Sequence, residues 1–160
     1  MMNHFEPEPV AAYLPHESPM ILLETLVSIS PEEVVAQVSV SADGVLSPFL
    51  TVEGDLPGWY AIEMMAQAIG VWSGWHGMQN GRPPLLGMLL GVRGFEIDLP
   101  VFSNEMILDV SALQLMSDGK LGSFSCLVRC AGNVLAKSQI NVYQPSEDEY
   151  QQLFGKLNKA

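Results

Sequence analysis

The sequence predicts an α+β fold in which an antiparallel β-sheet wraps around one long helix. Two strand-like runs come first, at residues 20–29 and 34–40, and one long helical segment follows at 57–76. The chain then returns to strand-like runs as far as residue 142. Strands joined by short turns pair in antiparallel fashion, and the single helix must bury its apolar surface against their sheet. The 160 residues are enough for one domain, 1–160.

The first two strands are recognised by their side chains. Residues 20–29 are rich in Ile, Leu and Val, and Ser30-Pro31 interrupts the chain after them. In residues 34–40, valine and alanine alternate with polar side chains, which is the period of a strand with one buried face. We therefore expect these runs to pair as an antiparallel hairpin.

The helix predicted at 57–76 is apolar on nearly all sides, which indicates that it is buried. Pro57 suits the first helical turn, where its missing N–H would have no partner in any case. Gly70 and Gly74 are costly inside a helix. Their presence indicates that a neighbouring segment packs closely against this helix.

The later strands are separated by turn signals. They are expected at residues 85–97, 106–111, 123–130 and 134–142. Asp118-Gly119 is a strong hairpin signal between two of them, and Gly132-Asn133 marks the next turn.

The C-terminal segment, about 146–159, is expected to form a helical tail. Ser146 and Glu149 fit a capping box at its start. Lys156 and Lys159 fall in its last turn, where cations suit the helix dipole.

The charge of the chain excludes several classes of partner. The formal net charge is −11, and the seven basic residues are scattered. A nucleic-acid groove needs a basic stripe, and an anionic membrane surface would repel this chain. The most apolar window, 56–75, contains Glu63 and Gln67, so we expect no membrane span. Residues 1–10 do not resemble a signal peptide, and we expect a cytoplasmic protein.

Cysteine and histidine give no sign of a metal site. Cys126 and Cys130 are four apart, which in a strand places them on one face but too far apart for an easy disulfide. We expect them to be free thiols. With only three histidines and no clustered ligand spacing, neither a metal nor another cofactor is expected.

Glu63 is the unusual residue of the predicted helix, because it lies among apolar neighbours with Gln67 one turn later. Carboxylates are rarely buried unless they are paired or used. Burial favours the protonated form of a carboxyl, which would suit a general acid. The alternative is that Glu63 reaches solvent at the edge of the helix and has no chemical role.

The histidines are weaker candidates. His16 precedes the first strand, and a single histidine there is more often structural than catalytic. His4 lies near the N-terminus, and His76 lies near the end of the long helix, where the dipole favours a cation.

Two segments of the chain resemble the 3-hydroxyacyl-[acyl carrier protein] dehydratases of fatty-acid synthesis. The segment 14–24, LPHESPMILLE, resembles the opening of these enzymes. The segment 57–67, PGWYAIEMMAQ, resembles their central helix, and the likeness continues through 70–75, GVWSGW. It covers about 13–143 and is closest to the dehydratase-like proteins of aryl polyene clusters. The resemblance implies the hotdog fold, in which a sheet wraps one helix and subunits pair as dimers.

The resemblance also implies roles for individual residues. Glu63 corresponds to the acid that protonates the departing hydroxyl, and Gln67 would orient it. Gly58 would supply a backbone N–H that holds the thioester oxygen, as a helix start can. The implied reaction removes water from a 3-hydroxyacyl thioester bound to an acyl carrier protein and leaves a 2-enoyl thioester.

The chain departs from this family at the histidine that acts as base. That position, fourteen residues before the acid, is Phe49 here. We consider three hypotheses. His16 supplies the base, a different hotdog subunit supplies it in a heterodimer, or the protein is a non-catalytic partner subunit. The first hypothesis is compatible with a homodimer, because the chain then carries both the acid and the base. An acyl-thioesterase is a further alternative, because hotdog domains also hydrolyse thioesters with an acid on this helix.

Overall fold

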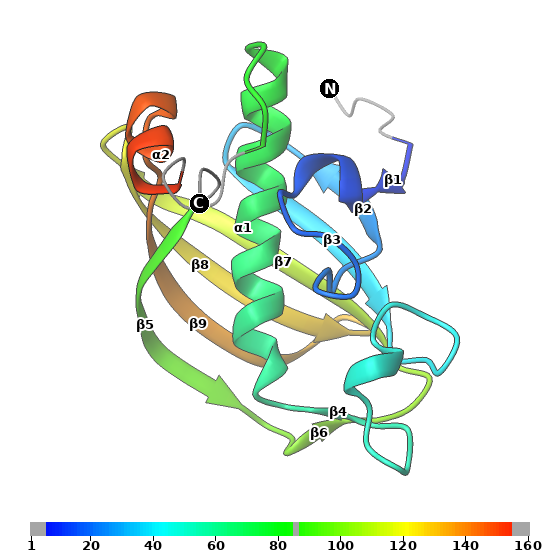
Figure 1. Cartoon of the computed structure of the whole chain (residues 1–160). Helices are drawn as coiled ribbons and strands as arrows, with labels where there is room; N and C mark the ends of the chain where they lie inside the picture. Colours follow the sequence, from blue (N-terminus) through cyan, green and yellow to red (C-terminus); the bar gives the residue numbers. More distant parts are fainter. Residues whose placement is uncertain (1–5, 85–86, 155–160) are drawn as a thin grey trace.

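The computed structural model describes residues 6–84 and 87–154, and it places one long helix across a curved antiparallel sheet (Figure 1). The helix, α1, runs over Tyr60–Gln79. The sheet has the strand order β1-β2-β3-β7-β8-β9-β5, and β4 pairs with β6 in a separate ribbon. The strands are β1 Glu8–Pro9, β2 Thr25–Ile29, β3 Glu33–Ser39, β4 Leu56–Pro57, β5 Met88–Ile97, β6 Val101–Phe102, β7 Ile107–Ser117, β8 Leu121–Cys130 and β9 Asn133–Tyr143. The predicted α+β architecture is confirmed.

The predicted hairpins are present. β2 pairs with β3, β7 with β8, and β8 with β9, all antiparallel. The turn after β7 is closed by the Asp118 N–H, which donates to the Leu121 carbonyl at 3.0 Å. Gly119 and Gly132 adopt positive φ angles in the two turns, as these signals predict.

Two predicted boundaries are wrong. The first strand begins at Thr25 rather than at residue 20, because the segment before it is bound to the helix instead of to another strand. The helix begins at Tyr60 rather than at Pro57, which lies in β4 opposite Val101. This pairing with β6 holds Pro57 in an extended conformation. Residues 85–86, the start of one predicted strand, lie outside the described residues.

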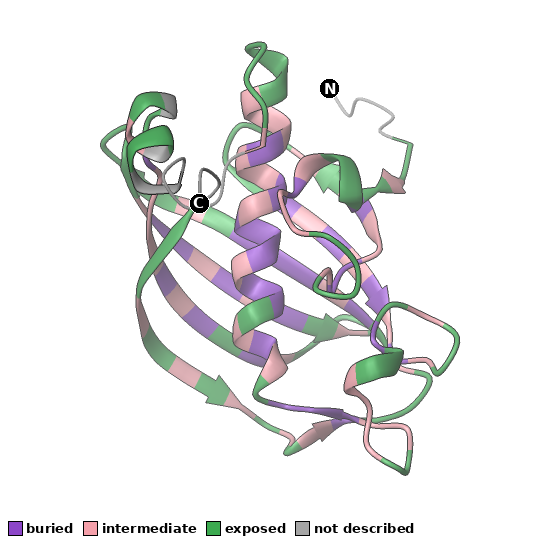
Figure 2. Ribbon diagram, viewed as in Figure 1, coloured by how far each residue is buried: buried purple, intermediate pink, exposed green. Residues whose placement is uncertain are grey.

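The core lies between the sheet and α1, as the purple bands in Figure 2 show. β3 alternates buried and half-buried residues, with Val34, Ala36 and Val38 facing inward. Met64 and Met65 of α1 are both fully buried against this layer. The predicted burial of the helix is therefore confirmed, although its N-terminal half also carries the exposed Glu63.

Close packing against the glycines of α1 is also confirmed. A Cβ atom added at Gly74 would lie 2.0 Å from the Tyr13 carbonyl oxygen, and one added at Gly70 would lie 3.0 Å from a Leu14 methyl group. Tyr13 ends the short 3₁₀ helix Val10–Tyr13, which crosses α1 at this point. The N-terminal segment can therefore approach the helix backbone only because residue 74 has no side chain.

We expect Gly74→Ala to destabilise the protein by about 1–3 kcal/mol or more, because the new methyl group overlaps backbone that cannot rotate away. Gly77→Ala is the matched control. The nearest atoms there lie 3.9 Å from the added Cβ. This helical alanine should stabilise by about 0.5–1 kcal/mol. Urea unfolding of both variants measures the difference, and equal midpoints would contradict the close approach.

The edge strand β5 carries apolar side chains that face solvent. Leu89 is 51% and Leu90 57% exposed, and Met88 beside them is also exposed. β5 pairs with β9 on one side and ends the sheet on the other. The described chain thus has an open, apolar sheet edge.

The C-terminal helix α2 (Glu147–Phe154) is anchored to the tip of the β7–β8 hairpin. The Ser146 hydroxyl accepts from the Glu149 N–H at 3.2 Å, as the predicted cap requires. The Glu149 carboxylate also accepts from Lys120 and from the Tyr143 hydroxyl. The expected tail beyond residue 154, with Lys156 and Lys159, lies outside the described residues, as does His4.

This anchor predicts that α2 loosens in acid. Hydrogen bonds from Lys120 and then Tyr143 lower the pKa of the Glu149 carboxyl. These bonds stabilise the folded chain fully above pH 4.3, which is about the ordinary pKa of a glutamate carboxyl. Their contribution is lost as the pH falls through the lower pKa that Glu149 has in the folded chain. NMR shifts of Lys120 and Glu149 between pH 7 and 3 should report the release. Glu149→Gln should remove the transition, and the exposed Asp148→Asn should retain it.

The predicted free thiols are confirmed, since neither Cys126 nor Cys130 is in a disulfide. Burial raises the pKa of the Cys126 thiol to about 12, so it stays protonated and unreactive.

Among the described residues, no helix is long and apolar enough to cross a membrane. Within those same ranges, no group of His, Cys, Asp and Glu is placed to hold a metal ion.

Candidate functional site

Gln67 holds the N-terminal segment against α1 through a buried amide. Its side chain is 1% exposed. Its Oε1 accepts from the Leu22 N–H at 2.8 Å, and its Nε2 donates to the Met20 carbonyl at 2.8 Å. At Met20 and Leu22 these bonds take the place of the strand pairing that the sequence predicts, whereas the Glu24 N–H donates to the Gln37 carbonyl of β3. The segment that carries His16 is therefore joined to the helix that carries Glu63.

The same amide also contacts Glu63. Gln67 Nε2 donates to Glu63 Oε1 at 3.1 Å, as the one-turn spacing on α1 allows. This bond fixes the direction of the carboxylate. Glu63 is exposed in the described chain, which agrees with the alternative that it reaches solvent at the helix edge. Its apolar neighbours on α1 point into the core instead.

His16 and Glu63 line the same cavity, which has a volume of about 160 Å³. The cavity lies beside α1, between the N-terminal segment and strands β5 and β9. His16 is half-buried, and its Nδ1 atom is buried without a hydrogen-bond partner in the described part of the chain. The structure thus brings together a carboxylate, an imidazole and the Gln67 amide from segments distant in sequence. This cavity is the candidate site.

Gly58 and Phe49 lie at the start of α1. The Gly58 N–H donates to the Pro100 carbonyl at 2.9 Å, so the donor expected to hold a thioester oxygen is occupied in this conformation. A Cβ on Gly58 would lie 2.7 Å from an Ile97 methyl group and 3.0 Å from the Pro100 carbonyl oxygen, so a side chain would be crowded here. Phe49 packs on Tyr60 with ring centroids 5.4 Å apart. An aromatic contact therefore occupies the sequence position at which the dehydratases carry histidine.

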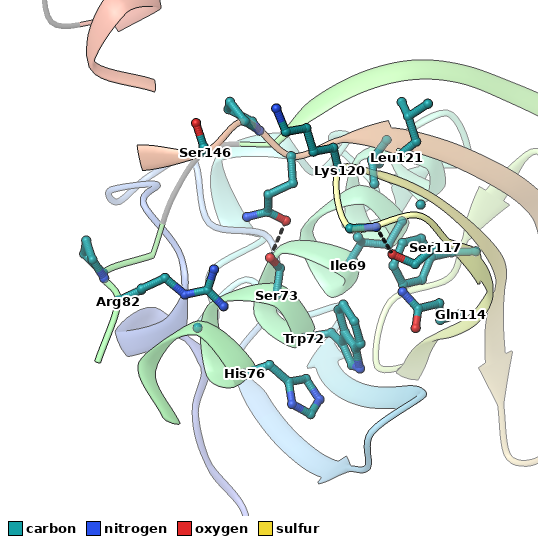
Figure 3. A pocket seen from close by; sticks show the side chains of 18 residues that line it. Ile69, Trp72, Ser73, His76, Arg82, Gln114, Ser117, Lys120, Leu121 and Ser146 are labelled. Atoms are coloured by element: carbon teal, nitrogen blue, oxygen red, sulfur yellow. Dashed lines mark hydrogen bonds between the residues drawn. The ribbon is translucent and has the colours of Figure 1, made fainter. Parts of the chain in front are cut away.

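A second cavity, of about 220 Å³, adjoins the first toward the C-terminal end of α1 (Figure 3). The boundary between the two is made by residues that line both: Ile69, Ser73, Val142 and Gln144. Across it, the Ser73 hydroxyl donates to Gln144 Oε1, the dashed line in Figure 3. This bond joins α1 to the end of β9.

Sequence reasoning missed Ser73 and Gln144 as parts of the site. Ser73 could have been found, because it continues the helical spacing that Glu63 begins. The residues of α1 that line the first cavity are Glu63, Ala66, Gln67, Ile69, Gly70 and Ser73. Gln144 could not have been found, because no local pattern shows that the end of β9 meets this face of the helix.

One helix wrapped by an antiparallel sheet, with an acid on the helix at a cavity, defines a protein of the hotdog-fold class. The family model of the ApeP-like proteins, described as ApeP dehydratase, matches residues 8–155. The chain belongs to this family, and it is a dehydratase or a dehydratase subunit. The predicted resemblance to dehydratases is thereby confirmed.

A solved structure supports the same assignment. The chain is 51% identical to one in the dehydratase heterocomplex ApeI:P from Xenorhabdus doucetiae, with a TM-score of 0.85. The match covers 92% of this chain and 97% of that chain.

More distant structures share the fold alone. A mutant of the phenylacetic acid degradation protein PaaI from Thermus thermophilus is 16% identical with a TM-score of 0.56, over 75% of this chain and 91% of its own. A hypothetical thioesterase with coenzyme A from Streptococcus pneumoniae is 15% identical with a TM-score of 0.57, over 89% and 100%. No match was found among the curated proteins.

Proposed function

We propose that the chain is a subunit of a 3-hydroxyacyl-[acyl carrier protein] dehydratase that acts in the synthesis of a polyene or fatty-acyl chain. Its reaction converts a 3-hydroxyacyl thioester to a 2-enoyl thioester and water. The observation that carries the proposal is the placement of Glu63, which Gln67 orients at a cavity that His16 also lines. The family of the chain supports the choice of reaction.

In the proposed mechanism Glu63 is the general acid. A base removes a proton from C2 of the acyl group, and the electron pair of that C–H bond forms the C2–C3 double bond. The C3–O bond breaks, and Glu63 gives its proton to the hydroxyl, which leaves as water. The base then holds one proton and Glu63 has lost one, so a transfer between them through solvent restores the site.

Two sources of the base are supported by separate observations. His16 lines the cavity with Glu63 and keeps a buried ring nitrogen without a partner in the described residues. A partner hotdog subunit is the other source, because Phe49 replaces the usual histidine and the relative with 51% identity is part of a heterocomplex. The exposure of Glu63 in the single chain also fits a site that a second subunit closes.

Pairing with a second hotdog subunit is part of the proposal. The open edge of β5, with Leu89 and Leu90 exposed, is long enough to extend the sheet into another subunit. A cytoplasmic location remains a prediction.

For Gly58 to hold the thioester oxygen, its N–H has to release the Pro100 carbonyl and donate to the substrate instead.

The experiment that tests the function compares the chain alone with the chain co-purified with a candidate hotdog subunit. Each is given a 3-hydroxyacyl thioester on an acyl carrier protein, and products are identified by mass spectrometry. A 2-enoyl thioester supports the proposal, whereas free acid and free thiol identify a thioesterase. No product with either preparation would contradict it.

His16→Ala decides the source of the base. If His16 is the base, the substitution lowers the rate of the active preparation by about 10²–10⁴-fold. If the partner supplies the base, the rate changes little. The urea midpoint of His16→Ala is measured beside its rate, so that a loss of activity through unfolding is recognised.

A further inference from the structure

Strands β7 and β8 lie in the middle of the sheet, and α1 crosses one of their two faces (Figure 1). On the side of α1, Val110, Ala112 and Cys126 are fully buried. Side chains alternate between the two faces of a strand, so the residues between these three point away from the helix. Two of the side chains on this outer face are large and apolar: Leu113 is 37% and Met116 70% exposed.

The register of β7 with β8 arranges the outer face in four rows. Residues directly opposite each other on paired strands share a face, and each row has one residue from each strand. The rows are Asp109 with Arg129, Ser111 with Leu127, Leu113 with Ser125, and Met116 with Ser123. Each row therefore combines either two opposite charges or one large apolar side chain with one serine.

This pattern is complementary to itself. In a two-fold interface both copies use the same surface, so every contact occurs twice. When the axis runs between β7 and β8 and parallel to them, each β7 residue lies over the β8 residue of the same row in the other copy. Asp109 then faces Arg129 of the second copy, and Leu113 lies over Ser125 of the second copy. Sheets packed face to face keep their strands within about 30° of each other, so these central rows stay close to register.

The serines of these rows form the hollows that the large side chains need. Ser111 and Ser123 are each only 7% exposed, although both point outward. Ser111 lies between the longer side chains of Asp109 and Leu113 along β7. Across the axis, every leucine or methionine of a row therefore has a serine opposite it, as interdigitating side chains between two sheets require.

The distribution of charge also favours this face. Two copies of a chain with a net charge of −11 repel each other over most of their surface. The outer face is balanced instead. The strands β3, β7, β8, β9 and β5 carry three acidic and three basic side chains, and the register places all six on it: Glu33, Glu96, Asp109, Arg93, Arg129 and Lys137. Lys137 and Glu96 form an ion pair of 3.2 Å.

The face is large enough for a specific contact. β7 has 11 residues and β8 has 10. Strands of this length extend over about 34 Å, and four neighbouring strands are about 19 Å wide. The central four strands thus offer roughly 600 Å² on each copy, or about 1,200 Å² in total, which is the lower limit for stable specific interfaces.

We propose that the outer face of β7 and β8 binds a second copy of this chain about a two-fold axis between these strands. Pairing along β5 uses the edge of the sheet and leaves this face free. Two complexes of the chain with a hotdog subunit are then joined back to back through their two copies of this chain. The contact is separate from the cavity of Glu63 and does not depend on the proposed reaction.

The first test counts the copies of this chain in one particle. Sedimentation equilibrium is measured over a range of concentrations for the full chain co-purified with its hotdog subunit. Ser125→Arg fills the hollow beneath Leu113 of the second copy, so we expect the number of copies to halve. Ser28→Arg is the matched control, an exposed serine on β2, and should keep the wild-type number. An equal number in the wild type and Ser125→Arg, or a loss in both variants, would overturn the proposal.

The second test exchanges the charges of one row. Arg129→Asp places acid against acid at two symmetric positions, and like charges across an interface are unfavourable. We expect the Kd of self-association to rise at least about 100-fold. Asp109→Arg combined with Arg129→Asp restores opposite charges and should bring the Kd back to within about tenfold of the wild type. Urea midpoints verify that both variants are folded. A Kd unchanged by Arg129→Asp, or not recovered by the double variant, would contradict the two-fold arrangement.

Discussion

Glu63→Gln is expected to lower kcat for enoyl formation by at least about 10²-fold, because the substituted amide cannot give up a proton to the leaving hydroxyl. The change should leave the fold intact. Glu63 is exposed, and the new amide keeps an oxygen that accepts from Gln67 Nε2. The measurement is the initial rate of 2-enoyl product from the active preparation, together with its urea midpoint.

Glu53→Gln is the matched control for this variant. Glu53 is exposed in the turn before β4 and lines none of the cavities described above. The control removes the same charge and should retain full activity. If Glu63→Gln retains activity as well, the chain is not the source of the acid, and it acts as a non-catalytic partner subunit.

Gln67→Leu is expected to have the largest effect on stability of any single change at the site. It leaves the Leu22 N–H and the Met20 carbonyl without their partner, and an unsatisfied buried group costs about 1–3 kcal/mol. The segment carrying His16 then loses its attachment to α1. Activity should fall with stability, because Glu63 also loses the bond that orients it.

Urea unfolding and the rate of enoyl formation check this prediction together. Gln79→Leu, at the exposed C-terminal end of α1, is the control and should unfold close to the wild type. A Gln67→Leu variant as stable as this control would show that the N-terminal segment does not depend on the amide.

The parts of the fold that follow from local pattern were predictable. The buried helix, the hairpins at Asp118-Gly119 and Gly132, and the close contact at Gly74 all follow from spacing or composition. Pro57 was misplaced because its environment is set by β6, more than forty residues later. Residues 20–24 look like a strand because they are apolar, yet their backbone partners include a helix side chain.

The site was predictable only in part. Glu63 stands out because a carboxylate in an apolar helix is rare, and Gln67 follows it at one-turn spacing. The resemblance to dehydratases suggested His16, but its place at the same cavity depends on how Gln67 attaches the N-terminal segment. That Arg82 and Lys120 both line the second cavity was not predictable, because they belong to separate loops that only the folded chain brings together.

The open edge of β5 has a consequence for how the protein is made. An exposed apolar strand edge is a template for uncontrolled pairing, and natural proteins usually cover it. Leu89 and Leu90 stay exposed on any molecule that has no second subunit along this strand. Copies synthesised in excess should therefore precipitate or be degraded, so the abundance of the chain would follow the supply of whatever covers β5. The two subunits would then have to be produced in matched amounts, both to keep this chain in solution and to allow catalysis.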